Sequence, residues 1–306
     1  SSAIAAARPQ DTIVIRPGTY KETVTLSRDV KIVGEGGRSK VILEGENGYS
    51  TFTINSGNPE ISGVSIQYTG LENPGYGLGA ISVFGGSPTI EDCDLTSTAG
   101  SAVYIQGITA KPVVRNCTIR NCRDSGVMIY ESGSGNIEGC RISGNSSSGI
   151  LIREGGNPEI RDCEIRDMRQ FGIVISNNGK GMILRTSVSD CELSGIVVRD
   201  GGNPDVRDCQ IRNNKQSGVF VLDQGLGTFQ NCEIAGNAYA GVTTQAGGNP
   251  TVRNCQIRNG KSTGVYVHNL GQGVFTGNTL TGNANSAWTI WYDAGRVTRT
   301  GNFPNS

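Results

Sequence analysis

Apolar and polar residues alternate in short segments that recur along the chain. One segment begins with a glycine, and the first and third residues after it are nearly always Val or Ile, as in GILIRE (149–154), GIVVRD (195–200) and GVYVHN (264–269). Alternation of β-branched residues is typical of a strand with one buried face. A second segment, such as VRNCQI (252–257), turns its first apolar residue, its Cys and its last Ile inward. The pattern therefore predicts short strands in each repeat.

These segments return at a fixed interval. Glycines at positions 126, 149, 172, 195, 218, 241 and 264 lie 23 residues apart, and cysteines at 93, 117, 140, 163, 209, 232 and 255 follow them in register. Equivalent residues recur once per turn, and no Asn-Gly hairpin joins antiparallel neighbours. We predict an all-β right-handed parallel β-helix, a solenoid of about 10–12 turns that rises ~4.8 Å per turn.

The repeat also sets the expected domain organisation. We expect a single β-helix domain over residues 1–306, because the period is not interrupted. Residues 1–50 should form an N-terminal cap and the first turns, with a short capping helix over residues 1–8. Regular turns should follow over 51–295, and residues 296–306 should form a tail. A cap is needed because the end of a stacked sheet exposes unpaired backbone groups.

Charge and hydropathy exclude two classes of partner. Lys and Arg total 27, and Asp and Glu also total 27. Nucleic acid would require a basic face, so we expect no nucleic-acid partner. No apolar run approaches the ~20 residues of a membrane span, so we expect no membrane partner. Nothing in the sequence predicts a cofactor.

The nine cysteines favour free thiols over disulfides. Their number is odd, and seven lie in one column, where stacked side chains point the same way and fit poorly to disulfide geometry. We interpret them as small buried hydrophobic residues, with Thr186 and Asn278 in the same column. This favours a reducing compartment such as the cytoplasm. A single column cannot surround a metal ion tetrahedrally, so we predict no metal site.

The opening segment DTIVIRPGTYKETVTLSRDVKIVGEGG (11–37) and the repeated GGNPxIRxCxI and GVxVxxxGxG units resemble the pectin-lyase-like superfamily of right-handed β-helices. More narrowly, they resemble the CASH-type repeats of carbohydrate-active proteins, of bacterial repeat proteins and of the substrate-recognising β-helix of certain F-box proteins. This resemblance implies the fold more strongly than any activity. An Asp-Pro-His segment, which the resemblance associates with alginate epimerases and lyases, is absent, and the one His is His268.

Two outward columns of the strand that follows each glycine form the first candidate site. Their members are Tyr104, Met128, Leu151, Val174, Val197, Phe220 and Tyr266, and then Tyr130, Arg153, His268 and Trp291. If exposed, such an apolar stripe would mark an interface or a binding groove, and its aromatic residues would suit sugar rings or an extended peptide. Cover by the loop at 68–76, by a second copy in a homodimer, or simple β propensity would also explain the pattern. This stripe predicts a non-catalytic scaffold that recognises a protein or a polysaccharide.

A column of acidic residues forms the second candidate site. Glu154, Asp200 and Asp223 stand five residues after a glycine, and Arg199 precedes Asp200. Stacked carboxylates could act as general acid and base in a polysaccharide lyase or a glycoside hydrolase, with Ca²⁺ as a cofactor if the protein is an enzyme. Acidic residues before a Gly also commonly bond the turn backbone, which is the interpretation we favour. A purely structural repeat module is the third alternative.

Overall fold

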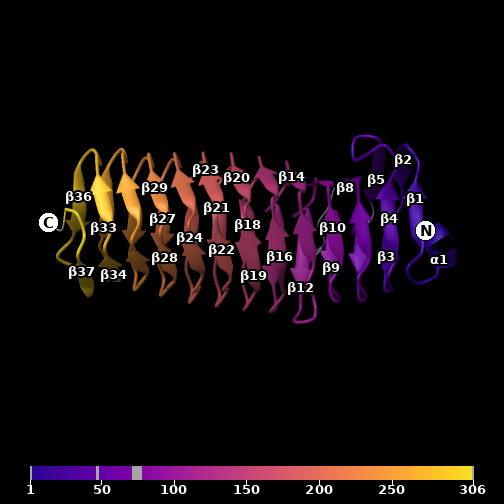
Figure 1. Cartoon of the computed structure of the whole chain (residues 1–306). Coiled ribbons are helices and arrows are strands. Elements are labelled where there is room, and N and C mark those ends of the chain that lie inside the picture. Colours follow the sequence, from indigo (N-terminus) through magenta and orange to yellow (C-terminus); the bar gives the residue numbers. More distant parts are fainter. Residues whose placement is uncertain (1, 46–47, 71–77, 305–306) are drawn as a thin grey trace. The chain divides into compact units, whose positions relative to one another are not determined.

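Short parallel strands make up nearly all of the regular secondary structure in the computed structural model (Figure 1), which describes residues 2–45, 48–70 and 78–304. One short helix, α1 (Ser2–Ala6), precedes them. The chain divides into two compact units, residues 1–150 and 151–306. In both units the strands follow one another through three sheets, which we call A, B and C, so one turn supplies one strand to each sheet.

In the first unit, equivalent strands of successive turns pair in parallel. Sheet A contains β1 (Thr12–Ile15), β4 (Lys31–Gly34), β7 (Glu60–Ser62), β10 (Thr89–Glu91), β13 (Val113–Arg115) and β16 (Ser134–Glu138). Sheet B contains β2 (Gly18–Lys21), β5 (Val41–Gly45), β8 (Ser65–Tyr68), β11 (Asp94–Ser97), β14 (Thr118–Arg120) and β17 (Arg141–Ser143). Sheet C contains β3 (Val24–Leu26), β6 (Phe52–Ile54), β9 (Ile81–Val83), β12 (Val103–Gln106) and β15 (Val127–Tyr130). Strand β18 (Ser148–Ile152) contains the boundary between the units.

The second unit repeats the same order. Its sheet A contains β19 (Asn157–Arg161), β22 (Met182–Leu184), β25 (Asp205–Arg207), β28 (Thr228–Gln230), β31 (Thr251–Arg253), β34 (Gly273–Thr276) and β37 (Val297–Thr300). Sheet B contains β20 (Glu164–Arg166), β23 (Ser187–Ser189), β26 (Gln210–Arg212), β29 (Glu233–Ala235), β32 (Gln256–Arg258) and β35 (Thr279–Thr281). Sheet C contains β21 (Phe171–Ile175), β24 (Ile196–Val198), β27 (Val219–Val221), β30 (Val242–Thr244), β33 (Thr263–Val267) and β36 (Ser286–Ile290).

The predicted fold class is confirmed. The chain is an all-β parallel solenoid of about 12 turns with about 23 residues per turn, and the short N-terminal helix is present. One detail of the prediction is wrong, because residues 297–300 of the expected tail form β37. This strand continues the register, with Gly273 of β34 opposite Val297, since the edge of β34 offers unpaired backbone groups. The expected loop at 68–76 lies largely outside the described residues, which omit 71–77.

The interior is built from columns of identical or similar side chains. In sheet B of the second unit, the central residue of each strand is buried, in the order Ile165, Val188, Ile211, Ile234, Ile257 and Leu280. β-Branched side chains pack well on this pleated surface because their χ1 freedom is restricted and they fit against neighbours on the same face. All nine cysteines are free and buried. Burial raises the pKa of Cys122 and of Cys191 to about 12, so both remain neutral thiols near pH 7.

Buried asparagines satisfy the backbone at one corner of the turn. Asn237 accepts hydrogen bonds at Oδ1 from the backbone N–H of Asn214, at 3.0 Å, and from its side-chain amide, also at 3.0 Å. Its own amide donates to the carbonyl oxygen of Ile211 at 3.1 Å. Asn214 repeats the pattern by accepting from the N–H of Cys191 at 3.1 Å. These side chains replace backbone partners that a sharp corner would otherwise leave unpaired in the interior.

Candidate functional site

Five residues of the predicted apolar stripe are buried, so the expectation that they form an exposed surface is wrong. They are Tyr104, Met128, Tyr130, Val174 and Val197, each at most 5% exposed. Parallel stacking is the cause, because Tyr104 lies in register with Met128, and Val174 with Val197, so each side chain flanks the next. The hydroxyls of Tyr104 and Tyr130 also form hydrogen bonds within the protein.

The Tyr104 hydroxyl accepts from the backbone N–H of Ser101 at 3.0 Å, and the Tyr130 hydroxyl donates to Oε1 of Gln106 at 2.8 Å. Such bonds let a phenol lie at low exposure without leaving a buried polar atom unpaired. These residues therefore stabilise the first unit, and a large ligand could not reach them without rearrangement.

The remaining stripe residues lie in the second unit and retain exposure. Leu151, Arg153, Phe220, Tyr266 and His268 are partly exposed, and Trp291 is exposed. The outward columns are continuous in register, since Phe220 of β27 lies opposite Thr243 of β30, which lies opposite Tyr266 of β33. The accessible part of the stripe is thus its C-terminal part.

A pocket of about 390 Å³ opens on this part of sheet C. It is lined by Lys215, Gln216, Ser217, Phe220, Ala238, Tyr239, Thr243, Gln245 and His268. Strands β27 and β30 supply Phe220 and Thr243 to the lining. The corners before these strands supply residues 215–217 and 238–239, and the residues that follow β30 and β33 supply Gln245 and His268. Two of the predicted binding residues, Phe220 and His268, therefore line one pocket.

Aromatic rings cluster at this pocket, where Tyr239 and His268 line it and Tyr266 contacts both rings. The rings of Tyr266 and His268 stack with centroids 4.5 Å apart and an interplanar angle of 29°. Tyr239 meets Tyr266 edge to face, with centroids 5.7 Å apart. Both arrangements suit the ring quadrupoles. Burial, followed by the neighbouring Tyr266, raises the pKa of Tyr239, so its hydroxyl stays protonated and can donate a hydrogen bond.

The polar groups of the pocket are mostly uncharged. Ser217 and Thr243 share a hydrogen bond of 2.7 Å between their hydroxyl oxygens, and Gln216 and Gln245 contribute amides. Lys215 carries the one permanent charge of the lining, and its Nζ lies 2.6 Å and 2.7 Å from the two carboxylate oxygens of Glu192. No carboxylate lines the pocket itself among the described residues. The site is therefore amphipathic and close to electrically neutral.

Sequence reasoning missed the corner residues of this pocket, namely Lys215, Gln216, Ser217 and Tyr239. The sequence considered only strand positions, where the alternating pattern separates inward from outward side chains. Corners have no such alternation, so residues 215–217 and 238–239 could not be assigned to a face. The one signal in the sequence is the spacing of Gln216 and Tyr239, which stand one 23-residue period apart and are therefore stacked on successive turns.

The predicted acidic residues lie at corners and not in the pocket. Glu154, Asp200 and Asp223 have φ values of 50°, 51° and 46°, in the left-handed region that Asp and Asn tolerate better than most residues. The backbone N–H of Asp200 donates to the carbonyl of Asp223 at 2.9 Å, so these corners stack directly. The geometry supports the interpretation of these residues as turn residues.

Their charges are partly balanced by neighbouring arginines. Arg199 Nε lies 3.5 Å from Asp200 Oδ2, and Arg153 Nε lies 3.4 Å from Glu154 Oε1. The side chains of Asp200 and Glu154 remain 45% and 37% exposed, in contact with solvent. None of these acidic residues lines the pocket on sheet C, and their catalytic role stays a prediction.

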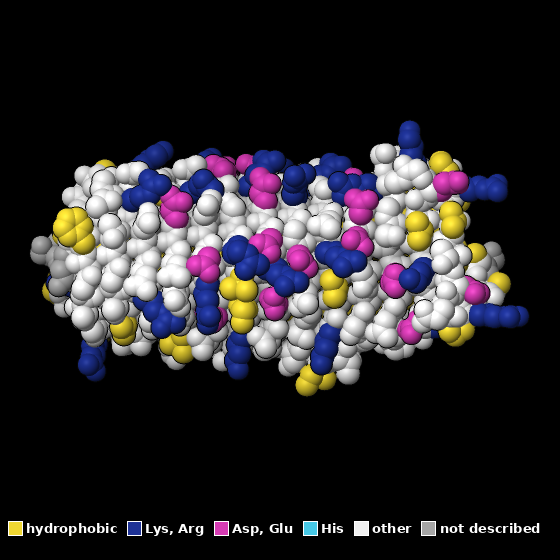
Figure 2. All heavy atoms as spheres, in the orientation of Figure 1, with side chains coloured by type: hydrophobic (Ala, Val, Ile, Leu, Met, Phe, Trp, Pro, Cys, Tyr) yellow, Lys and Arg dark blue, Asp and Glu magenta, His cyan; other side chains and the backbone are white. Residues whose placement is uncertain are grey.

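Charges of both signs are mixed over the surface shown in Figure 2. Paired examples are Arg185 with Asp162, at 2.8 Å between Nε and Oδ1, and Arg115 with Glu91, at 2.8 Å between Nη2 and Oε2. On this face Lys and Arg do not gather into one large basic patch. Within the described ranges, no group of three or more His, Cys, Asp or Glu residues could hold a metal ion, and no helix is long and apolar enough to span a membrane.

The chain is similar to several solved β-helical structures. It aligns with the A-module of the mannuronan C-5 epimerase AlgE6 from Azotobacter vinelandii at a TM-score of 0.72 and 16% identity, covering 98% of this chain and 92% of that one. For a periplasmic alginate epimerase, AlgG, the TM-score is 0.71 at 14% identity, with coverages of 94% and 78%. For an α-1,3-glucanase catalytic unit from Streptomyces thermodiastaticus it is 0.71 at 15% identity, with coverages of 98% and 64%. At these identities the likeness shows the fold alone.

Sequence comparison gives a relative and a family. The chain is 29% identical over 161 residues to the F-box protein dre-1 of Caenorhabditis elegans, which covers 45% of this chain and 17% of that protein. The chain thus matches less than a fifth of the length of that curated relative. The family model for the right-handed β-helix region matches residues 50–185 and 148–303, far more than half of the chain. The protein therefore belongs to the right-handed β-helix family.

Proposed function

We propose that this protein is a non-catalytic binding module for a neutral polysaccharide, which occupies the pocket on sheet C of the second unit. The observation that carries the proposal is the composition of the pocket, which combines the rings of Phe220, Tyr239 and His268 with amide and hydroxyl groups and contains no carboxylate. Such a mixture of apolar surface and a few polar groups is usual for small-molecule and sugar sites.

The aromatic residues match the two faces of a sugar. One face of a pyranose ring presents C–H groups, which pack on an aromatic ring, and its edge presents hydroxyls. The half-exposed ring of Tyr239 is accessible from solvent, and Gln216 and Gln245 can donate to and accept from the hydroxyls. The absence of a carboxylate in the lining supports binding over hydrolysis, because glycoside hydrolysis commonly uses a pair of them.

The charge of the pocket favours a neutral chain over an acidic one. Lys215 is the one permanent cation of the lining, and Glu192 neutralises it through both carboxylate oxygens. A uronic acid polymer would bring a carboxylate to each sugar without meeting an unpaired cation. Among the similar solved structures are epimerases named for mannuronan and alginate and an α-1,3-glucanase. This pocket suits a neutral glucan better than an alginate.

Calorimetric titration with neutral glucan oligosaccharides and with mannuronan oligosaccharides, each with and without Ca²⁺, tests the proposal. We expect saturable heat with a neutral glucan and weaker or no heat with mannuronan. Tyr239→Ala and Phe220→Ala, both at residues that line the pocket, should each weaken binding about fivefold or more, since an aromatic contact contributes roughly 1 kcal/mol or more. Tyr292→Ala is the matched control, because Tyr292 is 93% exposed and does not line the pocket.

Three outcomes would contradict the proposal. If the two pocket variants bind the neutral glucan as tightly as the wild type does, this pocket is not the binding site. Heat that persists after each injection, with release of new reducing ends or unsaturated sugars, would indicate turnover and favour an enzyme. Silence with every glycan would favour a protein partner, a homodimer or a purely structural role.

A further inference from the structure

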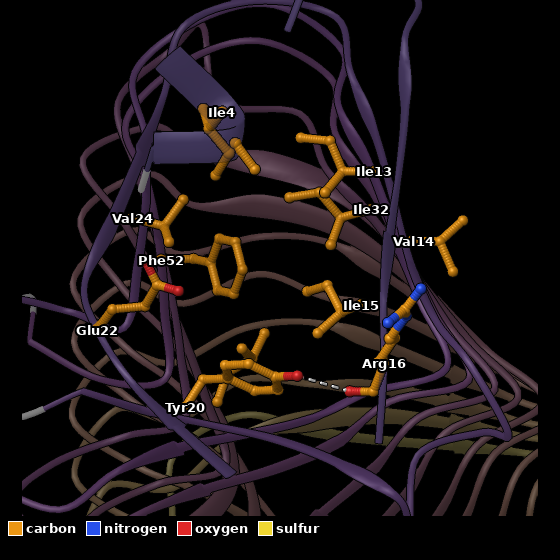
Figure 3. Close-up of a pocket in the computed structure, with 12 residues that line it drawn as sticks. Ile4, Ile13, Val14, Ile15, Arg16, Tyr20, Glu22, Val24, Ile32 and Phe52 are labelled. Carbon is orange, nitrogen blue, oxygen red and sulfur yellow. Dashed lines mark hydrogen bonds between the residues drawn. The ribbon is translucent and has the colours of Figure 1, made fainter. Parts of the chain in front are cut away.

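The N-terminal end of the first unit contains a second cavity, which is independent of the sugar pocket. It has a volume of about 300 Å³ and lies between α1 and the first turns of the solenoid (Figure 3). Its lining is Ala3, Ile4, Ile13, Val14, Ile15, Arg16, Tyr20, Glu22, Val24, Ile32, Leu43 and Phe52. Most of these side chains are aliphatic or aromatic, so the interior is apolar.

The inward side chains of β1 are less buried than those of the strands stacked on it. Ile13 and Ile15 of β1 occupy inward positions, and Ile13 is in register with the fully buried Ile32. Both residues of β1 are nevertheless only half-buried. Ile15 pairs with Gly34, which adds no side chain next to it. An apolar void that protein does not fill offers favourable burial to an apolar molecule.

Polar groups of the lining define how such a molecule would be oriented. The hydroxyl of Tyr20 is already used, since it donates to the backbone carbonyl of Arg16 at 3.0 Å. The guanidinium of Arg16 is exposed at the rim and forms no ion pair or hydrogen bond with any residue that the structure describes. Glu22 lies on the opposite side of the cavity in Figure 3 and has an interaction of its own. The rim beside Arg16 is therefore suited to an anionic head group.

We propose that this cavity binds a medium-chain fatty acid, with its hydrocarbon chain against Ile13, Ile32 and Phe52 and its carboxylate at Arg16. The volume lies at the lower end of the range for ligand pockets, which is sized for a single chain and too small for a helix or a sheet of a partner protein. Apolar lining and one unpaired cation at the mouth together match an amphipathic anion and no neutral sugar.

Titration with decanoate and with decanol, below their aggregation concentrations, tests this assignment on the whole chain. We expect saturable one-to-one binding of decanoate that competes with 1-anilinonaphthalene-8-sulfonate, and binding of decanol about fivefold weaker. Arg16→Gln should raise the Kd for decanoate about fivefold and leave the Kd for decanol unchanged. Arg8→Gln is the matched control, because Arg8 is exposed and does not line the cavity.

Filling the cavity should abolish binding. Ile13→Trp places a large ring in the space, and Ile4→Trp does so from α1, outside the sheets, so that one variant remains informative if the other fails to fold. Circular dichroism of each variant confirms the fold. The assignment is overturned if decanoate does not bind the wild type, if a folded filled variant binds as well as the wild type, or if Arg16→Gln and Arg8→Gln have equal effects.

Discussion

Replacement of Asn237 by Ala measures how much the buried asparagine corner contributes to the free energy of unfolding. The side chain is 1% exposed and makes three hydrogen bonds, two through Oδ1 from Asn214 and one from Nδ2 to the Ile211 carbonyl. Alanine leaves the N–H and the amide of Asn214 and the carbonyl of Ile211 without these partners inside the protein. A buried polar group left unpaired costs about 1–3 kcal/mol. A water molecule that enters the space would satisfy some of these groups, so we expect Asn237→Ala to lower the free energy of unfolding by about 3 kcal/mol in total.

Urea unfolding followed by circular dichroism is the assay for this prediction. Asn285→Ala is the matched control, because Asn285 also donates a side-chain hydrogen bond, to Ser262 Oγ at 3.1 Å, but is exposed to water. Water replaces the partner there, so the control should lose no more than about 0.5 kcal/mol. The reasoning is refuted if Asn237→Ala is destabilised by an amount within about 1 kcal/mol of the control.

Two further predictions concern the thiols and the acidic corner. Burial raises the pKa of Cys122 and Cys191 to about 12 from an ordinary value of 9.0. Between pH 9 and pH 12 the unfolded chain therefore releases thiol protons that the folded chain retains. Each thiol then lowers the free energy of unfolding by about 1.4 kcal/mol per pH unit. Urea unfolding between pH 8 and 10.5 should therefore show a shallower decline for the double variant Cys122→Ala/Cys191→Ala, and equal slopes would contradict the burial argument. At the corner, Asp200→Ala should lower the free energy of unfolding by about 1 kcal/mol and Asp200→Asn by close to nothing, because a left-handed φ of 51° is less unfavourable for Asn than for Ala, although Ala246 adopts a φ of 46° at the equivalent corner. If any glycan is turned over, its loss in the stable Asp200→Asn variant would assign Asp200 a catalytic role, and an unchanged rate would exclude it.

The sequence predicted correctly which residues stack in columns, but it did not predict which of the outward columns are exposed to solvent. Strand alternation correctly places Ile173 and Ile175 inward, yet Val174 between them is also buried. Alternation distinguishes two faces of a strand but says nothing about what flanks the outer face. In a parallel stack, the residue above and the residue below shield a short side chain, and the corners add further cover. Phe220 remained accessible and Val197 did not, although both belong to the same column.

The pocket on sheet C is lined both by strand residues, which the repeat pattern identifies, and by corner residues, which it does not. Phe220 and His268 could be identified as outward strand residues from the repeat, and both line the pocket. Tyr239 and Gln216 come from corners, whose side-chain directions depend on the backbone conformation and not on a simple period. The left-handed φ of Asp200 likewise became visible only in the structure, and it supports the turn interpretation of the acidic column that the sequence already favoured.

The sequence by itself determined the period of 23 residues, the parallel stacking and the buried thiols. Each follows because one 23-residue repeat forms one turn, so that equivalent residues of successive turns stack on one another. Tertiary structure alone decided where the surface is hollow. The pocket on sheet C of the second unit forms where corner residues flank Phe220, and the cavity of the first unit forms between α1 and the first strands (Figure 3). Both hollows depend on distances between segments that have the same repeat pattern in every turn. The periodic pattern therefore could not distinguish the turns that form a hollow from the turns that are fully packed.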